Sequence, residues 1–269
     1  MEDLAMMHGL SNTFLYTAKR VITLWNTNVG QVENSGTGFF INKGDVLYLI
    51  TNRHVVDLPY ADPQYIGATL IGCRCEGYES VRKDSLPSVY TTIHIKNYNK
   101  FVFHTNQNND IACLKDPESI DGSPSKISLP IDYELLASKE KIENDLTLCD
   151  TIAYPGFPKW YDRKNNTPIF RMGTIASDPR VGYSANAGDP DADRVAYEGF
   201  SSSGSSGSPV FATQRGFKVG GALKAAGDFY RPVMVVGINA GHYPSDEGHS
   251  GISWFFKSSA IIELIDSCT

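Results

Sequence analysis

The 269-residue sequence lacks long apolar runs and a strong excess of charge of one sign. Its longest apolar stretch, residues 46–50, is far shorter than the ~20 residues that a membrane-spanning helix needs. The 24 Lys and Arg side chains against 30 Asp and Glu give a formal net charge of −6. This mild acidity is spread without blocks, so we expect neither nucleic acid nor a membrane surface as a partner.

Cysteine is scarce and forms no recognisable framework. The five cysteines are an odd number, in a chain long enough to fold without cross-links. No second Cys/His pair at zinc-finger spacing accompanies Cys73 and Cys75, so we interpret both as neighbours on one face of a strand. The acidic N-terminus also lacks the basic start and apolar run of a secretory signal. We therefore expect a protein of the reducing cytoplasm, and we predict no metal and no other cofactor.

Short segments typical of β-strands dominate the chain, because β-branched and aromatic residues recur in runs bounded by turn residues. The first group covers residues 14–25, 36–41, 46–51, 68–75, 89–95, 100–104 and 111–114. The second group covers residues 146–152, 169–176, 194–200, 209–212, 233–238 and 252–256. Residues 115–144 between the groups are rich in turn signals and include a run of helix formers at 133–142, and residues 258–265 predict a closing helix.

Helices are nearly absent between the predicted strands, which disfavours a parallel sheet with helical crossovers. We therefore predict an all-β fold of two packed antiparallel units followed by a short C-terminal helix. The linker places the division between residues 1–133 and residues 134–269.

Three local patterns supply the residue types of nucleophilic catalysis. His54 follows an apolar strand, Asp110 opens another, and Ser206 lies in the glycine-rich segment 204–209 (Gly-Ser-Ser-Gly-Ser-Pro). A serine hydroxyl is a weak nucleophile at neutral pH and needs an adjacent base, which in turn needs an orienting acceptor. Each residue taken singly more often has a structural role. Their joint occurrence, with His and Asp in one half and Ser in the other, indicates a catalytic site.

These motifs resemble those of the trypsin/chymotrypsin-like serine peptidases. The resemblance rests on residues 51–54 (Thr-Asn-Arg-His), 110–112 (Asp-Ile-Ala) and 204–209, and it extends from about residue 21 to residue 256. Residues 36–39 (Gly-Thr-Gly-Phe), 154–156, 168–173 and 236–239 are similar to the HtrA-like and bacterial stand-alone branches. The resemblance implies two six-stranded antiparallel β-barrels, with the active site in the cleft between them.

By motif, the resemblance implies that Ser206 is the nucleophile, His54 the general base and Asp110 the orienting carboxylate. It also implies an oxyanion hole formed by the backbone N–H groups of Gly204 and Ser206. The Gly-x-Ser-Gly register selects Ser206 over the two neighbouring serines at 205 and 208.

Ser205 stands where digestive members of the family carry an aspartate that pairs with the N-terminus freed by zymogen cleavage. Without that carboxylate a buried ammonium would be unpaired, which is costly. We therefore expect the full-length chain to be competent without N-terminal processing. We also expect about the first 20 residues to lie outside the barrels.

The resemblance places Phe200, six residues before the nucleophile, on the floor of the primary specificity pocket. It places Asn239, Ala240 and Gly241 along one wall. Phe200 offers no carboxylate to a basic side chain, whereas Glu198, on the same face by alternation, is the one residue that could reverse this. We expect small or medium apolar residues to be preferred before the scissile bond, with poor cleavage after Lys or Arg.

Two alternatives stay open. The first is a catalytically silent binding module on the same fold, which the presence of all three residues disfavours. The second is an α/β-hydrolase esterase, which needs Gly-x-Ser-x-Gly and the chain order Ser, Asp, His. Ser208 occupies the last glycine position, and His242 and His249 lack a βαβ context. For the peptidase, the expected partners are a protein or peptide substrate and a regulatory protein.

Overall fold

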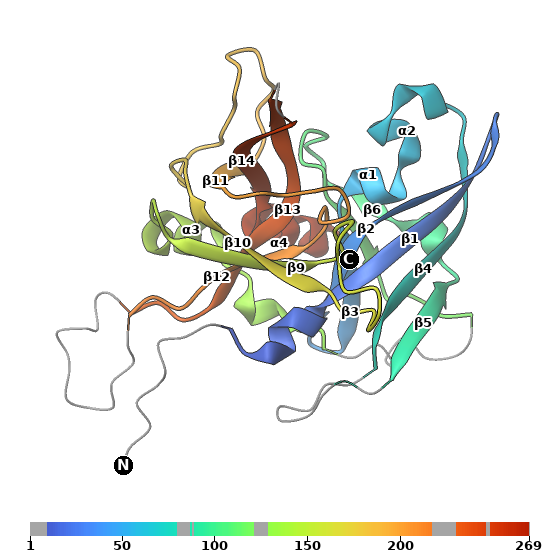
Figure 1. Ribbon diagram of the computed structural model, residues 1–269, viewed down its shortest axis with the longest axis horizontal. Helices are drawn as coiled ribbons and strands as arrows, with labels where there is room; N and C mark the ends of the chain where they lie inside the picture. Colours follow the sequence, from blue (N-terminus) through green and yellow to red (C-terminus); the bar gives the residue numbers. More distant parts are fainter. Residues whose placement is uncertain are drawn as a thin grey trace.

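The structure, a computed structural model, describes residues 10–79, 87, 89–120, 129–216, 230–245 and 248–268. Figure 1 shows two β units side by side, one built from the blue and green strands and the other from the yellow to red strands. The strands of the first unit precede those of the second along the chain.

The first unit is an eight-stranded sheet with the path β5-β4-β1-β2-β3-β7-β6, and β8 pairs with β2 off this path. Its strands are β1 (Ala18–Thr27), β2 (Gly30–Lys43), β3 (Val46–Thr51), β4 (Thr69–Tyr78), β5 (Tyr90–Ile95), β6 (Val102–Phe103), β7 (Ala112–Lys115) and β8 (Ile131–Asp132). The two-residue strand β8 pairs with β2 in parallel. It lies inside the segment interpreted as a linker, because the buried Ile131 side chain anchors that segment to the sheet.

The second unit is a closed six-stranded barrel in the order β10-β11-β14-β13-β12-β9. Its strands are β9 (Thr151–Gly156), β10 (Ile169–Ile175), β11 (Arg194–Glu198), β12 (Pro209–Ala212), β13 (Met234–Ser245) and β14 (Gly248–Lys257). All of its pairings are antiparallel. The predicted fold class is confirmed, and the α/β-hydrolase alternative is wrong because that fold needs a largely parallel sheet between helices.

Helices are few and short. The α-helices are α1 (Arg53–Val56), α2 (Leu58–Ala61), α3 (Lys139–Asp145) and α4 (Ser258–Ser267), and the 3-10 segments are η1 (Asn12–Thr17), η2 (Pro63–Tyr65), η3 (Tyr98–Lys100) and η5 (Tyr133–Leu135). The helix expected at 133–142 is divided, because Leu136 is extended and bridges to Val235 of β13. The closing helix is confirmed as α4. Within the described ranges no helix is long and apolar enough to cross a bilayer.

A shared apolar core joins the two units. Phe39 and Ile50 of the first sheet belong to the same buried cluster as Phe211 and Phe256 of the barrel, and Ile261 of α4 closes that cluster. Burial of each such side chain contributes roughly 1.5–3 kcal/mol. This packing holds the two units together, so that loops from both units meet along their junction.

The N-terminal segment packs on the barrel. The Phe14 ring of η1 lies 4.9 Å from the Phe211 ring between centroids, in an edge-to-face arrangement. Leu10 also packs against the shared core. The expectation that about the first 20 residues lie outside the barrels is therefore wrong for residues 10–20, because these apolar side chains find a buried surface. Residues 1–9 lie outside the described part of the chain.

Candidate active site

His54 lies in the single-turn helix α1, directly after β3. Two asparagines that sequence reasoning left without a role brace this turn. The Nδ2 group of Asn52 donates to the Asp110 carbonyl at 2.6 Å, and the Nδ2 group of Asn34 donates to the His54 carbonyl at 2.9 Å. Asn52 stood inside the histidine motif, but only the folded chain shows that its side chain ties α1 to the segment before β7.

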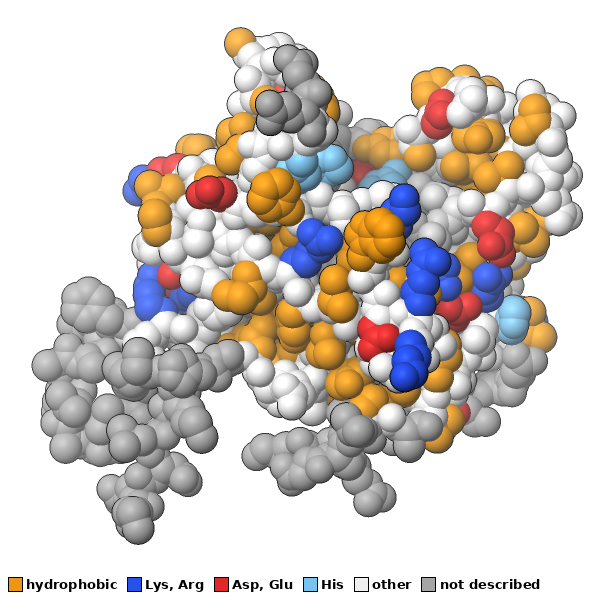
Figure 2. Space-filling view, in the orientation of Figure 1, with side chains coloured by type: hydrophobic (Ala, Val, Ile, Leu, Met, Phe, Trp, Pro, Cys, Tyr) orange, Lys and Arg blue, Asp and Glu red, His pale blue; other side chains and the backbone are white. Residues whose placement is uncertain are grey.

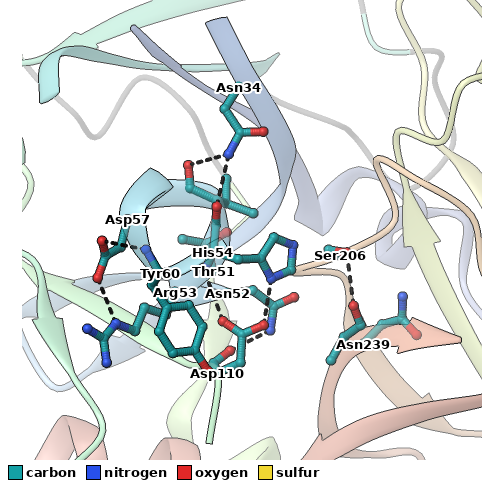
Figure 3. Close-up of polar contacts among 12 residues, drawn as sticks. Asn34, Thr51, Asn52, Arg53, His54, Asp57, Tyr60, Asp110, Ser206 and Asn239 are labelled. Carbon is teal, nitrogen blue, oxygen red and sulfur yellow. Dashed lines mark hydrogen bonds and ion pairs between the residues drawn. The ribbon is translucent and has the colours of Figure 1, made fainter. Parts of the chain in front are cut away.

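Asp110 holds His54 through two contacts. Its Oδ1 accepts the His54 backbone N–H at 2.9 Å, and its Oδ2 lies 2.5 Å from His54 Nδ1. An ionised carboxylate can only accept, so Nδ1 carries a proton and Nε2 of the neutral ring is left as an acceptor. Figure 3 shows the His54 ring between Asp110 and Ser206.

The charge state of His54 reflects two opposing effects. Burial lowers the pKa of His54, whereas the charge of Asp110 and its hydrogen bond to the ring raise it, and the net result is a pKa above the ordinary 6.5. The pairing with Asp110 therefore outweighs the cost of burying an imidazolium. Such a ring can take up a proton and hold it beside a carboxylate.

Ser206 lies in the loop between β11 and β12, across from His54 (Figure 3). Its hydroxyl donates to the carbonyl of Ala240 at 3.0 Å. Among the described contacts it makes no hydrogen bond to His54, and such a bond needs a rotation of Oγ about the Cα–Cβ bond to another staggered position.

The backbone of this loop requires glycine at two positions. Gly204 has a φ of +92° and Gly207 a φ of +89°, in the left-handed region that favours glycine. A Cβ on Gly204 would lie 2.3 Å from the Phe157 carbonyl oxygen, and one on Gly207 would lie 1.8 Å from the Thr37 carbonyl oxygen. Within the described residues, neither the Gly204 N–H nor the Ser206 N–H donates to a protein acceptor. Both remain available to an oxygen of a bound molecule.

Thr37 of β2 joins this loop to the first sheet. Its N–H donates to the Ser206 carbonyl at 2.8 Å, and its hydroxyl donates to the Gly204 carbonyl at 2.7 Å. The same hydroxyl accepts the Phe157 N–H at 3.1 Å. The Gly-Thr-Gly-Phe motif that contains Thr37 was noticed in the sequence, but it did not indicate what Thr37 does. The partners of the Thr37 hydroxyl lie 120 and 167 residues further along the chain.

The serines on either side of Ser206 face the interior. Ser205 is 1% exposed and Ser208 is fully buried. Neither hydroxyl has a hydrogen-bond partner among the described residues. Since a nucleophile must be reached by its substrate, their burial agrees with the register that selects Ser206.

Phe200 does not form a buried pocket floor. Its side chain is 64% exposed, and its ring lies 4.9 Å from the His249 ring between centroids. Glu198 is also exposed. The resemblance placed Phe200 on the floor, but β11 ends at Glu198 and the chain beyond it leaves the Phe200 side chain at the surface. The buried side chain at this point is that of Ser201, which accepts a hydrogen bond from Asn239 Nδ2 at 2.9 Å.

The other three predicted pocket residues lie on β13 beside the Ser206 loop. The Asn239 side chain is buried behind the loop, where it donates to the Ser205 carbonyl at 3.0 Å and accepts from the Tyr197 hydroxyl at 2.7 Å. Ala240 presents its carbonyl to Ser206. Gly241 leaves room for the Trp254 ring, which a Cβ would approach to 2.6 Å. Figure 2 shows histidine side chains gathered between the two lobes of this face.

Solved structures of low sequence identity share the fold. An HtrA-type protease, AlgW in a serine-to-alanine form with a tripeptide, is 17% identical with a TM-score of 0.53, and the match covers 94% of this chain and 60% of that one. Rv3671c from M. tuberculosis, a serine-to-alanine mutant in its inactive form, is 12% identical with a TM-score of 0.51, and the match covers 96% of this chain and 90% of that one. No curated protein matches this sequence.

A family model for the trypsin-like peptidase domain matches residues 36–220. This range is more than half of the chain, begins in β2 and ends beyond β12. It contains His54, Asp110, Ser206 and both glycines of the loop. The chain belongs to the trypsin-like peptidase domain family.

Proposed function

We propose that this protein is a serine endopeptidase that cleaves peptide bonds through an acyl-enzyme. The observation that supports it is the pair of hydrogen bonds between His54 and Asp110, beside the Ser206 loop. In the proposed reaction, Ser206 Oγ attacks the scissile carbonyl carbon while His54 Nε2 takes the hydroxyl proton. Asp110 orients the ring and stabilises the imidazolium. His54 then gives that proton to the leaving amine, and a water molecule hydrolyses the ester through the same steps.

The loop backbone supplies the stabilisation of charge. Negative charge develops on the carbonyl oxygen as the tetrahedral intermediate forms, and the free N–H groups of Gly204 and Ser206 are the donors for it. Loss of one such donor typically costs about 3–4 kcal/mol of barrier stabilisation.

A fluorophosphonate probe tests this function, because it labels only an activated serine. We expect labelling of the wild type and of Ser205→Ala and Ser208→Ala, and none of Ser206→Ala. The hydrogen bond from Ser206 to Ala240 favours the silent binding module as the second candidate. A folded wild type that resists the probe would support that candidate.

The pH dependence follows from the direction of the His54 shift. The general base must be neutral, and the pKa of His54 is raised above 6.5, so activity falls as the pH drops through a value above 6.5. We expect the acid limb of kcat/KM there. Asp110→Asn removes the charge that raises the pKa while burial still lowers it, so its limb moves to lower pH. An identical limb in both proteins would show that another group is titrating.

Thr37 is expected to act as a positioning residue for the loop. Thr37→Val keeps the shape but leaves the Gly204 carbonyl and the Phe157 N–H without their partner. Each unsatisfied buried group costs about 1–3 kcal/mol, and we expect kcat to fall roughly 10- to 100-fold with little change in KM. Thr37→Ser, which retains Oγ, should recover most of the activity.

Thr17→Val is the matched control. Among the described residues, the Thr17 hydroxyl, also buried, has one partner, the Phe14 carbonyl, to which it donates at 2.8 Å within η1. The Thr17→Val variant should have a lower free energy of unfolding without the selective fall in kcat. Equal kinetic losses in the two valine variants would contradict a specific role for Thr37.

We also propose a substrate preference and a mode of activation. The disfavoured cleavage after Lys or Arg no longer rests on Phe200 as a buried floor. Arg171 donates to the Phe200 carbonyl at 2.5 Å and would repel a basic side chain, whereas Glu198 lines the same surface pocket as Phe200 and is the carboxylate that could reverse the preference. The buried Ser205 hydroxyl offers no carboxylate to a new N-terminus. We therefore propose that the chain acts on protein or peptide substrates without N-terminal processing, under the control of a regulatory protein.

A further inference from the structure

We propose that Cys268 and Cys113 form a reactive thiol pair that exchanges with low-molecular-weight disulfides of the glutathione type and closes to an intramolecular disulfide. Cys113 lies in β7, and Cys268 directly follows α4. Both are free thiols. The proposal uses none of the three candidate catalytic residues, so it stands or falls independently of the peptidase function.

The two thiols meet where α4 packs on the first sheet. Cys113 is fully buried and Cys268 is 8% exposed, and both belong to the apolar cluster that joins the two units. Each thiol also shifts the pKa of the other, as neighbouring side chains do. A disulfide needs its two Cβ atoms about 3.5–4.5 Å apart, so closure requires the two side chains to come to that separation.

One of the two thiols borders a surface pocket. Cys268 lines a pocket of about 420 Å³ together with Lys100, Lys115 and Glu118. Cys113 does not line it. Cys268 is therefore the thiol that a small disulfide can reach, and Cys113 is placed behind it to resolve the product. Asp116 and Glu118 also line the pocket, and Lys100 is paired with Glu118 at 3.7 Å, so Lys115 is the ammonium group that we assign to a carboxylate of glutathione.

The electrostatics distinguish the same two roles. The hydrogen bond from Cys113 lowers the pKa of Cys268 to about 7; burial opposes this, and the Ser267 hydroxyl and the Lys115 charge lower it further. The hydrogen bond to Cys268 and burial raise the pKa of Cys113 well above its usual value. Cys268 therefore carries the thiolate, which is the attacking species in disulfide exchange.

The exchange proceeds in two balanced steps. The Cys268 thiolate attacks one sulfur of glutathione disulfide, a mixed disulfide forms at Cys268, and one glutathione thiolate leaves. Cys113, as its thiolate, then attacks the Cys268 sulfur and expels the second glutathione. Two protein thiols are oxidised to one disulfide, and one glutathione disulfide is reduced to two thiols.

The other three cysteines are internal controls. Cys73 and Cys75 are buried on one face of β4, as predicted. Each lies beside the other on that strand, but neither lines the pocket that Cys268 borders. Cys149 is exposed, so its reaction with a disulfide would measure solvent accessibility alone. A Cys149→Ser background removes that reaction and leaves the two buried pairs to compete.

The experiment incubates the full-length Cys149→Ser chain with glutathione disulfide at neutral pH and follows it by mass spectrometry and non-reducing peptide mapping. We expect a disulfide between Cys113 and Cys268, no retained glutathione, and reduced Cys73 and Cys75. Adding Cys113→Ser should stop the reaction at one stable glutathione adduct on Cys268. Adding Cys268→Ser should abolish it, because Cys113 is buried. The closed form should melt roughly 5–10 °C higher than the reduced form.

Retention of both thiols in the folded Cys149→Ser chain, or oxidation of Cys73 with Cys75 instead, would overturn the proposal. If the Cys113→Ser variant does not fold, the time course of the Cys149→Ser chain decides the order of attack. The adduct must appear on Cys268 before the disulfide forms, and an adduct first seen on Cys113 would refute the assigned roles.

Discussion

Replacing Ser206 by alanine is expected to reduce kcat for peptide hydrolysis by roughly four to six orders of magnitude, because the variant has no nucleophile. The fold should be retained, since within the described part of the chain the Ser206 hydroxyl makes one hydrogen bond, to the Ala240 carbonyl. Steady-state kinetics on a peptide that the wild type cleaves, with a thermal melt on the same preparation, measure both effects.

His54→Ala and the double variant with Ser206→Ala test whether the residues act as one unit. We expect the double variant to be about as slow as either single variant, because base and nucleophile serve the same step. Ser205→Ala and Ser208→Ala are the matched controls, since both hydroxyls are buried. An inactive Ser205→Ala variant together with an active Ser206→Ala variant would show that Ser206 is not the nucleophile.

Gly207→Ala is expected to lower the free energy of unfolding by at least about 3 kcal/mol, combining left-handed strain with a steric clash. Its φ is +89°, and the new Cβ would lie 1.8 Å from the Thr37 carbonyl oxygen and 2.8 Å from the Thr51 hydroxyl. The loop must move away from β2, which carries Ser206 with it. Chemical denaturation should show the loss of stability, and kcat should fall by more than about 100-fold.

Gly67 provides a closely matched control for this variant. Its φ is also +89°, but a Cβ there meets nothing within 4 Å. Gly67→Ala therefore keeps the left-handed strain, about 1–2 kcal/mol, and lacks the clash. Similar losses in both variants would show that backbone strain alone, and not the contact with Thr37, accounts for the effect.

The predicted strands were mostly correct because their signal is local. The runs at 46–51 and 209–212 coincide with β3 and β12, since β-branched and aromatic residues report strand preference within a few positions. Strand and helix ends were less predictable. Leu136 interrupts the expected helix at 133–142 because it pairs with Val235, about a hundred residues away along the chain.

His54, Asp110, Ser206 and the glycines of the loop could be selected from the sequence alone, because each sits in a short motif whose residue types match one chemical task. A contact between His54 and Asp110 was expected from the motifs, and the structure gives the distance between His54 Nδ1 and Asp110 Oδ2. The burial of Ser205 and Ser208 became visible only with the packing of β12 and β13.

Tertiary structure alone decided what supports these residues. Thr37, Asn34 and Asn52 act through hydrogen bonds to segments distant in sequence, and no local pattern reports such contacts. Phe200 was misplaced because the position six residues before Ser206 lies beyond the end of β11, where its side chain is exposed. The types of the candidate catalytic groups thus follow from the sequence, whereas their support and direction depend on how two β units pack around a common core.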